Sequence, residues 1–339
     1  MRGFTSPLWP IHYKPLPDEL LSCWLVRLAH GHGLKVQTFC NLIFGNRLQV
    51  WNRDIDRLAP SWLLDELSYR TGTSPEATLN TTLRAYEGLL YRKFRQASTL
   101  QWILALKMYH RKRAGYGLQF CPACLADDAI PYFRKRWRAA FNTVCTRHGT
   151  MLLDRCPKCG VAVAVHRIDM AGPNALEIGL MSYCHSCGFD LRDAPKVEPI
   201  SYDNQASALL IDASIVLDIN GETVGIEWNL ERYAVMHHLC RIVAAKYQHI
   251  HLREFVLGQI GIQEISLTEG RVSFEMRPVD ERHHLLQLTA WLLVDLEPRL
   301  TAVWRARAVR YNVLLKDFTE RPDWYSLIVE RFSNWRSRG

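Results

Sequence analysis

Apolar residues recur at intervals of three and four along the N-terminal part of the chain, the spacing of one face of an α-helix. The segment "PDELLSCWLVRLAHGHG" shows this spacing first, with Leu20, Trp24 and Leu28 among its apolar positions. Asp18 and Glu19 precede these positions and are expected near the positive end of the helix. We therefore predict an amphipathic helix here, followed by a second short helix in "KVQTFCNLIFG".

The segment "SWLLDELSYRTGTSPEATLNTTLRAY" predicts two more helices joined by a tight turn. Ser74 is a preferred N-cap residue, and Pro75 and Glu76 follow it at positions that suit the first turn of a helix. Two helices joined by a short turn that contains glycine form the helix-turn-helix pattern, which we place in residues 59–86. Its polar positions either contact the major groove of DNA or form a solvated helix face: Thr73, Ser74, Asn80 and Arg84.

The last third of the chain repeats the helical spacing in five segments, from "QASALLIDASIVLD" to "WYSLIVERFSNW", and "VSFEM" is a candidate short strand or wing. Residues 192–204 are polar and carry two prolines, which indicates a linker. The patterns predict a mainly α protein. An N-terminal helix-turn-helix domain is expected in residues 1–115, a cysteine-rich zinc-knuckle module in residues 116–191, and a C-terminal helical domain in residues 205–339.

Eight cysteine and histidine residues stand in four pairs, with two residues between the members of each pair. Two such pairs supply the four ligands of a structural zinc ion. In chain order they predict a first site of Cys121, Cys124, Cys145 and His148 and a second site of Cys156, Cys159, Cys184 and Cys187. An interleaved arrangement that uses His166 or His185 is the alternative. Gly160 and Gly188 each follow a pair and tolerate the positive φ of a knuckle turn.

Four ligands for each of two ions leave no open coordination position, so chemistry at the metal is not expected. The phosphate-loop, dinucleotide-binding, nucleophile-elbow and H-E-x-x-H motifs are absent from the sequence. Asp127 and Asp128 are expected in a solvated loop, and Cys23, Cys40 and Cys240 are expected to be free buried thiols. We therefore expect a protein that is not an enzyme.

The formal net charge of +8 is concentrated in the first 120 residues, which hold 16 lysines and arginines against 8 aspartates and glutamates. Residues 201–339 hold 16 against 18, so the C-terminal third is expected to bind phosphates weakly. Basic residues interleaved with aromatic ones favour contact with a nucleic acid or another partner, although a solvated basic face has the same composition. The candidates are Arg92, Lys93, Arg95, Arg111, Lys112, Arg113, Arg134, Lys135, Arg136 and Arg138. The last four are expected on a displayed loop or helix.

Hydrophobic residues make up 48% of the chain and charged residues 22%, an ordinary balance for a globular protein. No stretch of eighteen apolar residues and no signal-peptide pattern is found, so we expect a cytoplasmic protein that does not enter a membrane. In a reducing compartment paired cysteines are more often metal ligands than disulfides.

Three stretches carry the pattern of a known family: "PDELLSCWLVRLA", "CPACLADD...PYFRKRWRAAFNTVCTRHGTMLLDRCPKCG" and "RYNVLLKDFTERPDWYSLIVERF". The most specific portion, W-x7-C-x-x-H-G-x-x-L-x-x-x-C-P-x-C-G, runs from Trp137 to Gly160. With these stretches the chain resembles the TniQ family, the transposon target-selection proteins that include the TnsD subgroup. The resemblance implies that the eight paired cysteines and histidine form the family's two zinc sites and that residues 59–86 form its helix-turn-helix.

The resemblance also implies a non-enzymatic adaptor that marks a target DNA site and hands it to a TnsC-type AAA+ ATPase. In CRISPR-associated transposons the family member acts as a homodimer bound to the RNA-guided effector complex. Members that read an attachment site directly tend to have a longer C-terminal region, so 339 residues fit the compact, effector-bound kind. We therefore expect two zinc ions per chain, a homodimer, and a CRISPR effector ribonucleoprotein or target DNA as partner. The alternative is a direct sequence-specific DNA-binding protein, either an attachment-site reader or a zinc-ribbon transcription regulator.

Overall fold

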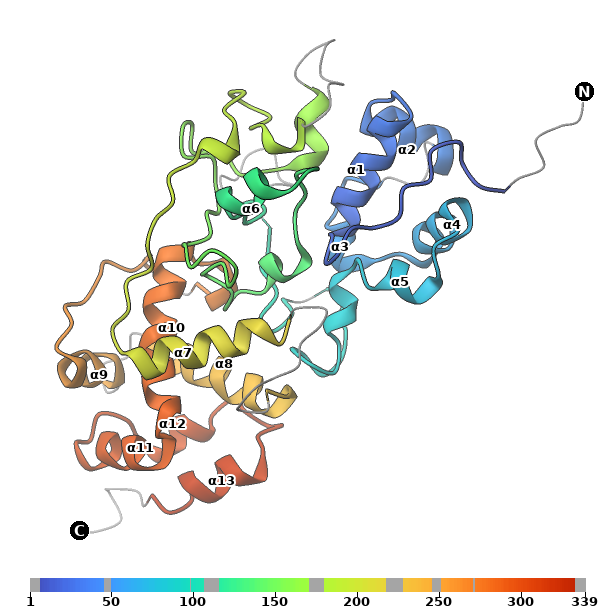
Figure 1. Cartoon of the computed structure of the whole chain (residues 1–339). Coiled ribbons are helices and arrows are strands. Elements are labelled where there is room, and N and C mark those ends of the chain that lie inside the picture. Colours follow the sequence, from blue (N-terminus) through green and yellow to red (C-terminus); the bar gives the residue numbers. More distant parts are fainter. Residues whose placement is uncertain are drawn as a thin grey trace, which may run out of the picture. The chain divides into compact units, whose positions relative to one another are not determined.

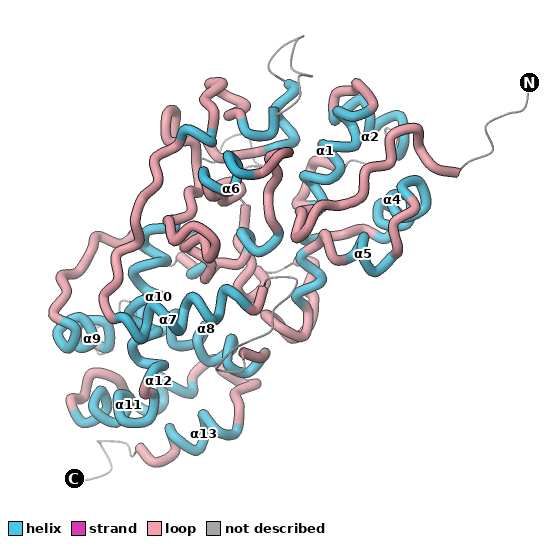
Figure 2. The backbone as a smooth tube through the Cα atoms, viewed as in Figure 1, coloured by secondary structure: helices cyan, strands magenta, loops and turns pink. Residues whose placement is uncertain are grey.

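The computed structural model describes residues 7–45, 50–97, 99–106, 116–170, 180–217, 228–245, 251–270 and 272–332. Within them the secondary structure is helical with isolated β-bridges, which confirms the mainly α class (Figures 1 and 2). The chain forms two compact units. The first comprises Met1–Glu87, Phe94–Ser98 and Ile103–Glu198, and the second comprises Gly88–Lys93, Thr99–Trp102 and Pro199–Gly339. The N-terminal helices and the cysteine-rich segment thus belong to one unit.

The first unit contains six α-helices and several short 3₁₀ turns among its described residues. The α-helices are α1 (Leu21–Gly31), α2 (Val36–Phe44), α3 (Ile55–Leu58), α4 (Ser61–Thr71), α5 (Pro75–Leu79) and α6 (Pro122–Asp127). The 3₁₀ turns are η1 (Leu83–Tyr86), η2 (Lys135–Arg138), η3 (Val165–Met170), η4 (Leu180–Ser182) and η5 (Leu191–Asp193).

Helix α1 lies at the centre of the first unit, in contact with α2, α3 and η3. Every residue from Leu21 to Ala29 is buried, so the predicted amphipathic helix has no solvent-exposed face over this stretch. Asp18 and Glu19 directly precede Leu20, the N-cap residue of the helix, and are not part of its first turn. Glu19 instead pairs with Arg27 inside the unit, with 2.7 Å between Oε2 and Nη2.

The turn between α4 and α5 has the predicted chemistry. Gly72 ends α4 in the left-handed region at φ 61°, and the Ser74 hydroxyl accepts a hydrogen bond from the Ala77 backbone N–H at 3.1 Å. Pro75 occupies the first turn of α5, as predicted. Helix α5, which would be the second helix of the helix-turn-helix, has only five residues. It is short for that role.

The second unit is built around its longest helix, α10. Its α-helices are α7 (Asn204–Ile215), α8 (Leu230–Ala244), α9 (Leu252–Ile260), α10 (Val279–Val294), α11 (Leu296–Arg305), α12 (Tyr311–Leu315) and α13 (Asp323–Val329). Helices α7, α8, α9 and α11 all contact α10, and its residues from Glu281 to Ala290 are buried. A helix covered on several sides in this way supplies the core of the unit.

Two details of the second unit differ from the prediction. The "VSFEM" segment forms a short 3₁₀ turn, η6 (Phe274–Met276), so the predicted strand is wrong. Helices α9 and α12 were not predicted; α9 contains Gly258, a poor helix former, and α12 has only five residues.

Among the described residues, no helix combines the length and the apolar character that a membrane crossing requires.

Candidate metal centres

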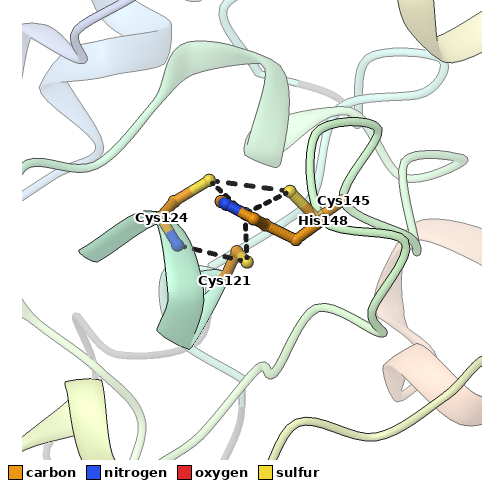
Figure 3. A group of neighbouring side chains, drawn as sticks. All are labelled: Cys121, Cys124, Cys145 and His148. Carbon is orange, nitrogen blue, oxygen red and sulfur yellow. Dashed lines mark hydrogen bonds between the residues drawn. The ribbon is translucent and has the colours of Figure 1, made fainter. Parts of the chain in front are cut away.

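The first cluster brings together the side chains of Cys121, Cys124, Cys145 and His148 (Figure 3). The sulfur atoms of Cys124 and Cys145 lie 3.6 Å apart. The Nδ1 atom of His148 lies 3.5 Å from the sulfur of Cys121, 3.3 Å from that of Cys124 and 3.6 Å from that of Cys145. The four donor atoms therefore surround one point.

The second cluster brings together Cys156, Cys159, Cys184 and Cys187. The sulfur atoms of Cys156 and Cys187 lie 3.7 Å apart, as do those of Cys159 and Cys184. In each cluster all donor atoms lie within 4.8 Å of one another. The structure thus groups the eight side chains in the two sets that their order in the sequence suggests.

The donor spacing fits a tetrahedral zinc ion. With Zn–S bonds of about 2.3 Å and Zn–N bonds of about 2.0 Å, two sulfur ligands lie about 3.8 Å apart and a sulfur and a nitrogen about 3.5 Å apart. The observed S···S distances of 3.6 and 3.7 Å and S···N distances of 3.3 to 3.6 Å match these values. Thiolates with a single imidazole are also the donors that structural zinc prefers.

Three of the four ligand pairs share one turn geometry. In each, the backbone N–H of the glycine after the pair donates to the carbonyl of the first cysteine: Gly149 to Cys145 at 2.8 Å, Gly160 to Cys156 at 2.9 Å and Gly188 to Cys184 at 2.9 Å. All three glycines have positive φ, at 63°, 71° and 67°. A side chain would strain this backbone, so the Cys-x-x-Cys/His-Gly spacing in the sequence determines the knuckle.

The remaining pair is held by a helix rather than by a knuckle. Cys121 is the N-cap of α6, and its sulfur accepts a hydrogen bond from the Cys124 backbone N–H at 3.4 Å. Pro122 fills the first position of α6, where a missing N–H costs nothing. A helix start therefore presents both cysteines to the first cluster.

Asp127 extends the first cluster beyond its four ligands. Its carboxylate lies 3.0 Å from Nε2 of His148, the ring nitrogen that faces away from the cysteines, and 3.3 Å from Nη2 of Arg147. A carboxylate on the outer nitrogen of a ligating histidine fixes the ring and raises its basicity. The expectation of a merely solvated loop is wrong here; the sequence signal was the position of Asp127, directly after the first ligand pair.

The two clusters differ in exposure to solvent. In the first, the three cysteines are buried, whereas in the second Cys159 is exposed and Cys187 half-buried. The backbone N–H of Phe189 lowers the pKa of the Cys187 thiol to about 7, which favours the thiolate form that binds metals. The second cluster thus presents two of its four sulfurs toward solvent.

The two histidines that could have entered an interleaved arrangement lie outside both clusters. The His166 ring is buried and stacks on Trp51, with ring centroids 4.9 Å apart. Burial lowers the pKa of His166 to about 4 and also lowers the pKa of His185. The four-and-four grouping therefore agrees with the geometry without either of them.

The basic segment between the first two ligand pairs is buried, which corrects the expectation that it is displayed. Arg138 is fully buried between two carboxylates, with Nη2 2.5 Å from Asp54 and Nη1 3.2 Å from Asp56. Burial, with the neighbouring charge of Asp54, raises the pKa of Asp56 to about 6. The Lys135 ammonium donates to the carbonyl of Asn80 at 2.7 Å and is also buried.

The other two cations of this segment are also engaged inside the first unit. Arg134 is buried and pairs with Asp128 at 2.8 Å, and the Arg136 guanidinium lies 3.7 Å from the carboxylate of Asp18. The pair of Arg136 joins the cysteine-rich segment to the residues before α1, and the pairs of Arg138 join it to α3. These ion pairs stabilise the unit rather than present charge to a partner.

The N-terminal basic candidates are distributed differently. Arg92, Lys93 and Arg95 are exposed, and Arg92 pairs with Glu320 at 2.8 Å. Contact of these residues with a partner stays a prediction. Arg111, Lys112 and Arg113 lie outside the described residues.

The predicted groove-reading positions of the helix-turn-helix are also partly occupied. Thr73 is buried, and Ser74 uses its hydroxyl to cap α5. Asn80 accepts the hydrogen bond from Lys135 through its backbone carbonyl, and Arg84 lies over the ring of Phe94. Helix α5 itself contains no lysine or arginine.

Comparison with known proteins gives one family. Residues 10–152 match the model of the TniQ family, a stretch that includes α1 to α6 and all four ligands of the first cluster. No curated protein matches the chain. The second cluster and the second unit's helices α7 to α13 lie beyond the matched residues. The similarity to the TniQ family is therefore established over residues 10–152.

Proposed function

We propose that both clusters hold zinc, two ions per chain, and that the protein is a non-enzymatic adaptor in transposon target selection. The similarity of residues 10–152 to the TniQ family supports the target-selection role. The observation that carries the rest is the closure of both ligand sets, each with four donors at tetrahedral spacing. A closed shell leaves no position for a substrate or a reactive water, so the metal serves the fold.

The segment that carries the ligands has little regular structure of its own, which is the physical reason for a metal. Between α6 and α7 the described residues form short 3₁₀ turns and isolated bridges, such as Val144 with Met151 and Tyr183 with Asp190. Bound zinc supplies cross-links between chain segments more than twenty residues apart, and such cross-links contribute folding energy directly.

We further propose that this adaptor is of the compact, cytoplasmic kind that works as a homodimer. In this reading it links a target-bound CRISPR effector ribonucleoprotein to a TnsC-type AAA+ ATPase. The support is the similarity of residues 10–152 to the TniQ family. Among the residues that the structure describes, the exposed cations Arg92, Lys93 and Arg95 are the sequence candidates for contact with such partners.

Direct reading of a DNA sequence by the helix-turn-helix region receives less support. A recognition helix presents polar or basic side chains to base edges and phosphates. The exposed residues of α5 include Pro75, Glu76 and Leu79, and its five-residue length offers less than two turns to a groove.

Zinc content tests the metal part of the proposal. Cys156→Ser in the full chain should lower the zinc content from about two ions to about one, since one thiolate of a four-cysteine site is lost. Cys240→Ala, a buried cysteine of α8 outside both clusters, is the matched control and should keep two. Unchanged zinc in Cys156→Ser contradicts the four-cysteine site.

Co-elution in size-exclusion chromatography tests the adaptor part. The zinc-loaded chain should co-elute with the effector ribonucleoprotein and with the ATPase. A chain that holds two zinc ions and is retained by neither partner would keep the metal assignment and contradict the bridging role.

A further inference from the structure

Four cations lie close together in sequence, from the last residue of α11 to the residue that follows α12. Arg305, Arg307 and Lys316 are exposed and Arg310 is half-buried; we call these four residues the arginine turn. Within the described parts of the chain, their side chains form no ion pair or hydrogen bond. Asp317, the acid next to Lys316 in the sequence, lies 3.9 Å from Arg241. The charge of the arginine turn is therefore not neutralised locally.

The backbone conformation at Arg307 is a second, independent observation that this side chain has a role other than stability. The N–H of Ala308 donates to the carbonyl of Val303 at 3.0 Å and that of Arg307 to Trp304 at 2.9 Å, the hydrogen bonds of a Schellman motif. Arg307 occupies the left-handed position of this motif at φ 57°, where glycine is the usual residue. A non-glycine residue in this conformation costs about 1 kcal/mol, so the side chain is retained at an energetic cost.

The turn is also fixed in place from beneath. Val303, Ala308 and Val309 are buried, and the carbonyl of Ala308 accepts a hydrogen bond from the His251 backbone N–H at 2.9 Å. Arg307 and Arg310 flank these buried residues in sequence. The arginine turn thus displays its charges on an anchored backbone, so little backbone entropy is lost when a ligand binds.

We propose that the arginine turn binds the phosphodiester backbone of duplex DNA. Unpaired guanidinium groups bind phosphate oxygens with two parallel hydrogen bonds, and three of the four cations are arginines. Residues 305–316 contain a single aromatic residue, Tyr311, which disfavours a single strand held by base stacking. The balance of 16 basic against 18 acidic residues in 201–339 conceals this local concentration.

The four cations are not explained by a favourable interaction with the negative C-terminal end of the α11 dipole. A cation in the last turn of a helix stabilises it by about 0.3–1 kcal/mol. Only Arg305 lies in that turn, whereas Arg307, Arg310 and Lys316 follow the helix. The site lies in the C-terminal unit, outside the residues of the family match, and does not depend on the metal centres.

Salt-dependent binding of the full zinc-loaded chain to a labelled DNA duplex, followed by fluorescence anisotropy, tests the proposal. Each phosphate contact on duplex DNA contributes about 0.9 to the slope of log K against log salt, so Arg305→Gln/Arg307→Gly/Arg310→Gln should lower the slope by up to about 2.7. At low salt the triple variant should bind at least about tenfold more weakly. Arg307→Gly alone should lower the slope by about 0.9 and raise the midpoint of thermal unfolding. A residue with a purely structural role would not show weaker DNA binding together with higher stability.

The matched control removes three arginines that already have carboxylate partners, two half-buried and one exposed: Arg70→Gln/Arg192→Gln/Arg331→Gln. This variant carries the same net charge and should keep the wild-type slope to within about one unit. An equal loss of slope in both triple variants contradicts a specific site. An unchanged slope in the arginine-turn variant overturns the proposal in favour of an acidic protein partner, and a loss seen only with RNA overturns the choice of duplex DNA. Zinc content and co-elution with partners report on the adaptor role separately.

Discussion

Asp127 links the first cluster to the surface of the molecule. Its carboxylate is about half-exposed and contacts both the His148 ring and the Arg147 guanidinium. The His148 ring donates through the nitrogen that does not face the cysteines, which keeps Nδ1 free to bind a metal. A single carboxylate therefore sets the tautomer of the one imidazole ligand.

Asp127→Ala should weaken zinc binding at the first cluster about 10- to 100-fold, because loss of such an outer carboxylate leaves the histidine less basic and less well oriented. Competition with a coloured chelator measures both affinities in one titration, and the second cluster serves as the internal reference. Asp65→Ala, an exposed residue of α4, is the control. Equal affinities of the wild type and Asp127→Ala would contradict the role.

His238 makes the second unit sensitive to acid. Its ring is buried, stacks on Phe318 with centroids 4.4 Å apart, and bonds through Nε2 to the carbonyl of Leu314 at 2.8 Å, while Nδ1 has no partner. Protonation would bury an unpaired N–H and a charge, so burial lowers the pKa to about 4. The folded state therefore holds this ring neutral.

A lowered histidine pKa destabilises the folded state as pH falls, because below about pH 6.5 the unfolded chain gains a proton that the folded chain does not. With a folded pKa of about 4, the loss amounts to about 2 kcal/mol at pH 5 and levels off below pH 4. His238→Phe should remove this part of the pH dependence. The free energy of unfolding of both proteins, measured by urea at pH 7.5 and 5, gives the difference; identical pH dependences would refute it.

Arg138 shows why burial of charged side chains could not be predicted from their own segment. The run of cations in residues 134–138 has the composition of a solvated face, and its partners Asp54 and Asp56 lie about eighty residues earlier in the chain. Removal of one partner leaves a buried charge, so such pairs are formed only where the fold brings both together. Metal ligands are easier to predict, because the two members of each ligand pair are recognised by their local spacing in the sequence.

At the scale of elements, the knuckle turns are the features that the sequence predicts best. The pattern of a ligand pair followed by glycine defines both the hydrogen bonds and the positive φ of the turn. Helices α1, α8 and α10 were likewise predicted from long apolar periodicity. The strand expected in "VSFEM" was wrong because five residues carry too little pattern to separate a strand from a turn.

Gly188→Ala should reduce the free energy of unfolding by about 1 kcal/mol, through the strain of a left-handed alanine. Its φ is 67°, and an added Cβ would meet no atom within 4 Å, so the cost is conformational rather than steric. Gly258→Ala in α9 is the matched control: it also has open space but lies inside a helix, and it should gain about 1 kcal/mol. Urea unfolding with excess zinc measures both; a gain in both variants would contradict the strained turn.

At the scale of the whole molecule, the two units differ in one respect: the first combines the buried helix α1 with the two candidate metal clusters. All eight candidate ligands lie in the first unit, where the segment from α6 to η5 has only short turns and isolated bridges. The second unit buries long apolar runs of α8 and α10 against each other. The proposed zinc sites thus belong to one unit, which length and composition alone could not indicate.

Removal of zinc should therefore loosen one unit and leave the other intact. A strong chelator takes away the cross-links of the first unit, whose free energy of metal binding is folding energy. Hydrogen exchange followed by mass spectrometry should then show lost protection in residues 116–170 and retained protection in α8 and α10. Readdition of zinc should restore the protection, whereas magnesium, which prefers oxygen ligands, should not. Equal loss in both units would mean that the second unit depends on the metal centres, and loss in neither would mean that the ligand segment folds without them.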